Sequence, residues 1–297
     1  MRIDLRIQLG REGRQGFLQT IAGERVWCDL PLTHDATSAM AYEAPPEDRV
    51  DRAWTTIYDG PGLLAGRRET IRSARGDEGG YRVEHADGEA YVIDAAGGSI
   101  RRATPGAPLA LERALGAPLA LAFAIRGLYL LHASALVGDS VIALTAASGG
   151  GKSTLAGGAS RFPELALSRI ADDQLPVRLG REPRALPHFP QPKLKPEEQY
   201  ASQLPPSLPL GALVELAADP GLTAPDLARI APPDAIQHLV GATVAAKLFD
   251  RELLTRHFHA CASAALELPV YHFRYPYGLE RIGEALAVLA GLAKPRS

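Results

Sequence analysis

Residues 145–154, Thr-Ala-Ala-Ser-Gly-Gly-Gly-Lys-Ser-Thr, have the types and spacing of a phosphate-binding loop. They lie between a short apolar run of strand type at 141–144 and a segment of helix formers that begins at Ser153. In this setting backbone N–H groups turn inward onto phosphate oxygens, a lysine neutralises the β- and γ-phosphates, and a hydroxyl binds Mg²⁺. The expected nucleotide ligands are Ala147, Ser148, Gly149, Gly150, Gly151, Lys152, Ser153 and Thr154.

One position departs from the P-loop, or Walker A, consensus G-x-x-x-x-G-K-[ST]. Its first glycine is Ala146 here, so the entry turn must be one that a Cβ atom tolerates. Two alternatives follow. Instead of a working phosphate loop, the stretch could be a glycine-rich strand-to-helix turn with a chance Lys-Ser pair, or the loop of a degenerate nucleotide sensor.

Two adjacent carboxylates, Asp172 and Asp173, end an apolar strand predicted at 165–171. Ligands of open α/β sheets bind outside the carboxyl ends of the strands, where the loop also lies. One carboxylate can therefore help to hold Mg²⁺, together with Ser153, and the other can face a substrate hydroxyl. The alternative is a turn that caps the strand.

His132 lies in the strand 128–137, which a two-residue turn at Gly138 and Asp139 joins to the strand before the loop. If Val137 pairs with Ser140, counting back places His132 opposite Thr145. The register thus predicts that His132 lies beside the phosphates. A packed or surface histidine is the alternative.

A proline-rich segment, 183–209, is expected to form a loop or lid rather than a regular ladder. It contains Lys193 and Lys195, two of only five lysines in the chain, which could face a phosphate or a substrate carboxylate, or form a solvated charge pair. Glu197 and Glu198 follow as further Mg²⁺ or substrate contacts.

The whole chain has 297 residues, 32 basic and 34 acidic, with a net charge of −2. This balance predicts neither nucleic acid nor an anionic membrane as a partner. Two distant cysteines and an N-terminus without a signal-type apolar run favour the cytoplasm. Alternation at period two predicts a β-rich N-terminal domain over 1–105, and the breaker cluster 104–108 separates it from an α/β domain over 106–297.

The order of His132, hairpin, glycine loop, helix, strand and Asp172-Asp173 resembles the catalytic domain of bacterial HPr serine kinases, whose fold is shared with phosphoenolpyruvate carboxykinases. The match covers roughly 125–180. The HPr-kinase-like proteins of lasso-peptide and other ribosomal-peptide maturation are more similar still, in length, in the Leu-His-Ala-Ser stretch and in Pro-Lys-Leu-Lys at 192–195. The family's downstream Glu-Arg-Gly signature and later arginine-bearing loop have no counterpart here.

The resemblance implies an α/β P-loop kinase domain of HPr kinase/PEP carboxykinase type that uses ATP or GTP and Mg²⁺. It implies a site of His132, Lys152 and Asp173, with Asp173 as base, Asp172 beside it and Ser153 on the metal. The expected reaction transfers the γ-phosphoryl to a serine or similar hydroxyl of a peptide or protein. The alternative is an ATPase or GTPase switch that transfers phosphate to water. The sequence leaves the base of the nucleotide and homo-oligomer formation open.

Overall fold

The computed structural model describes residues 4–9, 15–30, 32, 37–40, 53–64, 67–104, 111–147, 149–191, 193–194 and 203–294. Contacts divide the chain into a first unit, 1–128 with 245–256, and a second unit, 129–244 with 257–297. The described residues 111–128 group with the first unit, whereas we placed the domain boundary before them, at 105. That boundary between functional domains stays a prediction.

The first unit is built on one sheet, which confirms the predicted β-rich character of the first hundred residues. Within the described residues its strand order is β4-β2-β3-β1-β9-β8-β7-β6-β5. β1 runs parallel to β3 and β9, and the other neighbours are antiparallel. The strands are β1 Leu5–Gln8, β2 Gln15–Ile21, β3 Glu24–Cys28, β4 Thr37–Met40, β5 Trp54–Leu64, β6 Arg67–Gly76, β7 Tyr81–His85, β8 Ala90–Ile93 and β9 Ser99–Arg102.

Local sequence explains part of this sheet. β7 alternates buried and half-buried residues at period two, and the turn before β8 has Gly88 at φ +85°, which glycine adopts without strain. The β5–β6 hairpin was not predicted from the sequence, and it contains Pro61, a residue type that is disfavoured within strands. β5 lies at the edge of the sheet, where a missing N–H is tolerated.

The apolar segment that comes after the breaker cluster contains two helices, α1 Leu111–Leu115 and α2 Ala117–Ile125. They are separated at Gly116, and Pro118 lies in the first turn of α2. Residues 117–124 of α2 are all buried, and the helix packs on β7, β8 and β9. Burial on every side explains why this segment is apolar all round.

The second unit contains a mixed sheet, in which β11 and β12 form the predicted hairpin. Within the described residues the strand order is β10-β14-β15-β16-β12-β11-β13, and β18 pairs with β16 and β17. β12, β16 and β18 are parallel, whereas β11 lies antiparallel against β12. The strands are β10 Tyr129–Leu131, β11 Ser134–Val137, β12 Val141–Thr145, β13 Ser168–Ala171, β14 Leu175–Arg178, β15 Arg184–Ala185, β16 Leu208–Asp219, β17 Asp226–Arg229 and β18 Val270–Pro276.

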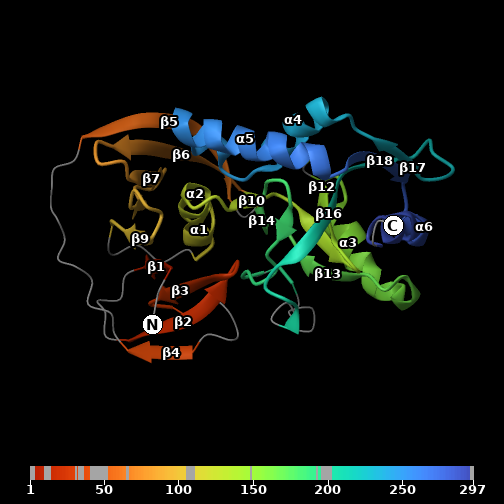
Figure 1. Ribbon diagram of the computed structural model, residues 1–297, viewed down its shortest axis with the longest axis horizontal. Helices are drawn as coiled ribbons and strands as arrows, with labels where there is room; N and C mark the ends of the chain where they lie inside the picture. The colour runs from red at the N-terminus through yellow and green to blue at the C-terminus, as the bar shows by residue number, and fades with distance from the viewer. Residues whose placement is uncertain are drawn as a thin grey trace. The chain divides into compact units, whose positions relative to one another are not determined.

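Helices cover both faces of this sheet (Figure 1). On one face α3 Lys152–Gly158 and α6 Ile282–Leu292 enclose a core that includes Leu144, Val214 and Phe273. α4 Pro232–Ala242 and the later part of α5 Arg251–Glu267 lie on the other. Short 3₁₀ turns are η1 Ala159–Arg161, which continues α3, η2 Pro163–Leu165, η5 Ala246–Leu248 and η6 Leu279–Arg281. In the part of the chain that the structure describes, no helix has the length and apolar composition needed to cross a membrane.

The turn between β11 and β12 corrects the predicted register by one residue. Val137 pairs with Val141 instead of Ser140, so Ser140 joins Gly138 and Asp139 in the turn. Ser140 is held elsewhere, because its N–H and Oγ both donate to the carbonyl of Ala293, at 3.0 and 3.2 Å. The predicted strand 128–137 is also divided into β10 and β11, with the N–H of His132 donating to the carbonyl of Ala242 at 2.7 Å.

Candidate active site

The glycine loop, residues 146–151, joins β12 to α3, and glycine is needed at several of its positions. Gly149 and Gly151 have φ of +79° and +86°, which L side chains rarely adopt. A Cβ on Gly150 would lie 2.6 Å from that of Ala146, and one on Gly151 would overlap Tyr275 Oη. Ala146 is not among the described residues with positive φ, so its Cβ is accommodated. Ser148 lies outside the described residues.

Lys152 begins α3 and is directed into the protein. The residue is only 9% exposed, and Nζ donates to the carbonyl of Ala146 at 3.2 Å. Burial lowers the pKa of Lys152, while Asp173 and Asp172 act in the opposite direction. Among the described residues no carboxylate forms an ion pair with Lys152. A buried ammonium in this situation gains most from an anion that binds to it, so the geometry suits a phosphate. Ala147 and Thr154, on either side of Lys152 in the chain, are exposed to solvent, so a ligand can reach the backbone there.

Asp172 is fixed by four contacts immediately after β13. Its Oδ1 accepts hydrogen bonds from Ser134 Oγ at 2.6 Å and Ser153 Oγ at 2.7 Å, and its Oδ2 lies 3.8 Å from Arg169 Nη1. Its N–H donates to Gln191 Oε1 at 3.0 Å. The residue is 7% exposed, so this carboxylate is buried and oriented before any ligand binds.

The backbone conformation of Asp173 directs its side chain away from that of Asp172. β13 ends at Ala171, and Asp173 has φ +81°, the left-handed region that few non-glycine residues occupy. Its Oδ2 is 2.6 Å from Lys193 Nζ, and its Oδ1 is 3.6 Å from His132 Nε2. The side chain is 35% exposed. Strained backbone of this kind is common at active sites.

His132 lies next to these charges although the register that predicted its place was wrong by one residue. Its pKa is lowered, first by burial and then by the positive charge of Lys152, against an opposing effect of Asp173. The imidazole is therefore neutral at pH 7. Its Nε2 lies 3.6 Å from Asp173 Oδ1, which is longer than a hydrogen bond, so Asp173 does not fix the orientation of the imidazole.

The predicted residues thus gather at one end of the second unit's sheet: Lys152, Ser153, Asp172, Asp173, His132 and Lys193. Lys195, Glu197 and Glu198 lie outside the described residues. Arg274 of β18 pairs with Asp219 at 2.5 Å.

Sequence reasoning missed Ser134, Gln191 and Tyr275. Ser134 had a signal, because residues i and i+2 of an extended segment share a face and His132 was already suspected. Gln191 and Tyr275 had none, since they come from distant segments that only the fold brings to the site.

Neither the family models nor the curated proteins that were compared match this sequence. Among solved structures, the HPr(Ser) kinase/phosphatase from Coxiella burnetii shows distant similarity, with a TM-score of 0.31 and 11% identity. The alignment covers 55% of this chain and 95% of that one.

Proposed function

We propose that this protein is a nucleotide-dependent kinase that transfers the γ-phosphoryl of ATP to a serine, or a similar hydroxyl, of a peptide or protein. The observation that carries the proposal is the separation of two adjacent carboxylates. Asp172 is buried and bonded to the hydroxyl of Ser153, whereas Asp173 is half-exposed beside His132 and Lys193. In kinases, one acidic group binds the metal ion and another accepts the proton of the acceptor hydroxyl.

Ser153 and Asp172 fit the requirements for Mg²⁺. A hydroxyl and a carboxylate oxygen 2.7 Å apart, at the start of α3, are the hard oxygen ligands that this ion prefers and the pair that P-loop enzymes use. When bound, the metal would neutralise charge on the β- and γ-phosphates. Ser134 shares the same carboxylate oxygen, at 2.6 Å, and so orients Asp172 for this role.

Asp173 would act as the base. As the acceptor oxygen forms its bond to the γ-phosphorus and the bond to the β–γ bridging oxygen breaks, the acceptor's proton passes to the Asp173 carboxylate and ADP leaves. Lys193 Nζ lies 2.6 Å from the Oδ2 of that carboxylate, and the lysine side chain is 48% exposed, so it can move aside for an acceptor. Lys152 would neutralise the phosphates.

His132 would assist rather than replace Asp173. A neutral imidazole can donate one hydrogen bond, either to the carboxylate or to a phosphate oxygen, without adding a charge to the site. Its lowered pKa supports that neutral state.

The test is phosphotransfer from γ-labelled ATP, and in parallel GTP, to a panel of serine-containing peptides that includes ribosomal-peptide precursors. Label in a peptide that depends on Mg²⁺ supports the kinase. Release of free phosphate at the same rate with and without peptides, and no labelled peptide, would overturn it in favour of a hydrolase. Asp139→Asn is the matched control, because Asp139 is an exposed carboxylate in the β11–β12 turn.

A further inference from the structure

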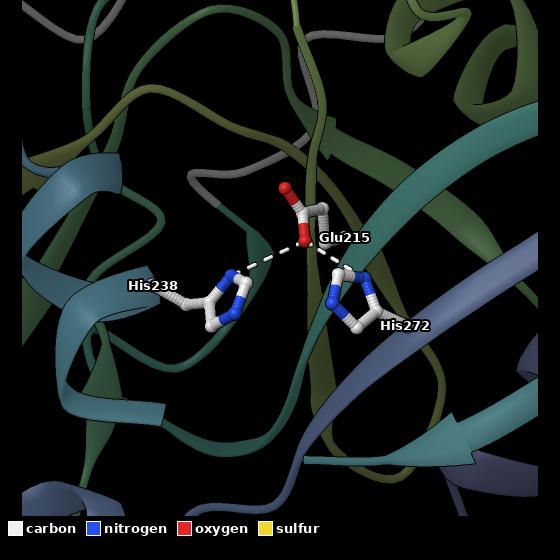
Figure 2. Close-up of side chains that lie close together, drawn as sticks. All are labelled: Glu215, His238 and His272. Atoms are coloured by element: carbon white, nitrogen blue, oxygen red, sulfur yellow. Dashed lines mark ion pairs between the residues drawn. The ribbon is translucent and has the colours of Figure 1, made fainter. Parts of the chain in front are cut away.

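A second group of chemistry-bearing side chains lies on the face of the sheet that α4 covers. Glu215 of β16, His238 of α4 and His272 of β18 converge in Figure 2. Nδ1 of His238 is 3.2 Å from Glu215 Oε2, and Nδ1 of His272 is 2.8 Å from the same oxygen. The three ligand atoms all lie within 4.8 Å of one another.

Hydrogen bonding does not account for this convergence. Glu215 Oε2 is buried, and among the described residues no donor meets it with hydrogen-bond geometry, despite the two nearby nitrogens. The imidazoles are close enough in distance but are not aimed as N–H donors. A buried carboxylate oxygen without a donor is costly, by ~1–3 kcal/mol or more, so a missing partner is the better explanation.

The spacing suits a metal ion at the centre. Ligand atoms about 2.0–2.1 Å from a metal, at angles of 90–109°, are separated by about 2.9–3.4 Å. The observed 3.2 and 2.8 Å already approach this range. We infer that Glu215, His238 and His272 bind a divalent transition-metal ion of the Zn²⁺ class.

The donor set favours this class over Mg²⁺. Two imidazole nitrogens and one carboxylate are ligands of zinc and other first-row metals, whereas Mg²⁺ prefers oxygen alone. Three protein ligands leave one tetrahedral position for water or a substrate atom. The side chain of His272 is 55% exposed, so one edge of the cluster faces solvent.

The location of this metal site relates it to the glycine loop without making it part of the proposed magnesium site. Glu215 is the Cα partner of both Thr145, the last residue of β12, and His272. The metal would therefore lie beside the strand end from which the loop begins, and would tie α4 to β16 and β18. The inference does not depend on kinase activity.

The experiment is a zinc titration of the full chain after removal of metals with a chelator, in excess Mg²⁺ and without nucleotide. Bound zinc is measured by elemental analysis and calorimetry, and Co²⁺ absorption reports the geometry. We expect one zinc per chain. Glu215→Gln, His238→Ala and His272→Ala should each weaken binding at least about 100-fold, because loss of even an outer partner of a ligand costs ~10–100-fold.

His259→Ala is the control, since His259 is an exposed histidine of α5 outside the cluster, and it should leave the zinc affinity unchanged. Circular dichroism confirms that each variant is folded, and His238→Gln replaces His238→Ala if that variant is not. Absence of stoichiometric zinc in the parent chain overturns the inference, and so does equal affinity in the parent and the three cluster variants.

Discussion

The substitution Asp173→Asn separates catalysis from folding at this site. Asparagine has nearly the same shape as aspartate and tolerates the left-handed backbone at φ +81°, so the change removes a charge without adding strain. Alanine at this position would remove the charge and add backbone strain at once, so a loss of activity could not be separated from a loss of stability. The perturbation is therefore confined to the proposed base and to its contacts with Lys193 and His132.

The expected effects of Asp173→Asn on folding stability and on the phosphotransfer rate differ enough in size to be distinguished. The side chains of Asp173 and Lys193 are 35% and 48% exposed, and an ion pair this exposed contributes only ~0.2–1 kcal/mol to folding. Loss of a general base costs at least ~10²-fold in rate, or about 2.7 kcal/mol in the barrier. The phosphotransfer rate should thus fall by at least about 100-fold in a protein that melts near the temperature of the parent.

Asp172→Asn gives the contrasting result. Asp172 is buried and accepts hydrogen bonds from two hydroxyls, so we expect a lower melting temperature and weaker binding of Mg-nucleotide. Single-turnover transfer of labelled phosphate, nucleotide affinity and thermal melting are measured for both variants, with Asp139→Asn as control. Full transfer activity in Asp173→Asn together with none in Asp172→Asn would refute the assignment and exchange the two roles.

Three further predictions follow from the same geometry. Lys152→Ala and Ser153→Ala should each abolish turnover, because positioning and charge neutralisation account for most of phosphoryl-transfer catalysis. Unchanged nucleotide affinity and rate in Lys152→Ala would exclude the loop as the phosphate site. Gly151→Ala should destabilise the protein more than Gly88→Ala in denaturant melts. Both residues have φ near +85°, but only a Cβ at 151 meets Tyr275 Oη. Equal losses of unfolding free energy in the two variants would contradict this. The free energy of unfolding should fall by about 2.5 kcal/mol between pH 6.5 and 4, because burial lowers the pKa of His257 to about 4 and the unfolded chain binds the proton first. His257→Gln should flatten that pH dependence, and an unchanged slope would show that another group causes it.

The sequence was sufficient for elements whose signals are local. Period-two alternation predicted the β-rich character of the N-terminal residues, and the strand–loop–helix order located β12 and α3. The residue types around the loop, together with two carboxylates at a strand end, were enough to suspect a phosphate site. Each of these signals comes from residues close together in the chain.

Contacts between distant segments decided the rest. The β11–β12 turn has three residues because Ser140 bonds to Ala293, near the other end of the chain, and the predicted strand 128–137 breaks where His132 meets Ala242. Alternation along a continuing strand would also direct Asp172 and Asp173 to opposite faces. The structure separates them instead through the positive φ of Asp173 after the strand has ended.

The cluster of Glu215, His238 and His272 depends most completely on tertiary structure. Its residues come from two strands and a helix, and their spacing in the sequence matches no metal-binding motif. Parallel pairing of β16 with β18 places Glu215 beside His272, and the packing of α4 adds His238. Local periodicity specifies which face of an element is buried, but not which elements become neighbours, so only the folded chain could bring these three ligands together.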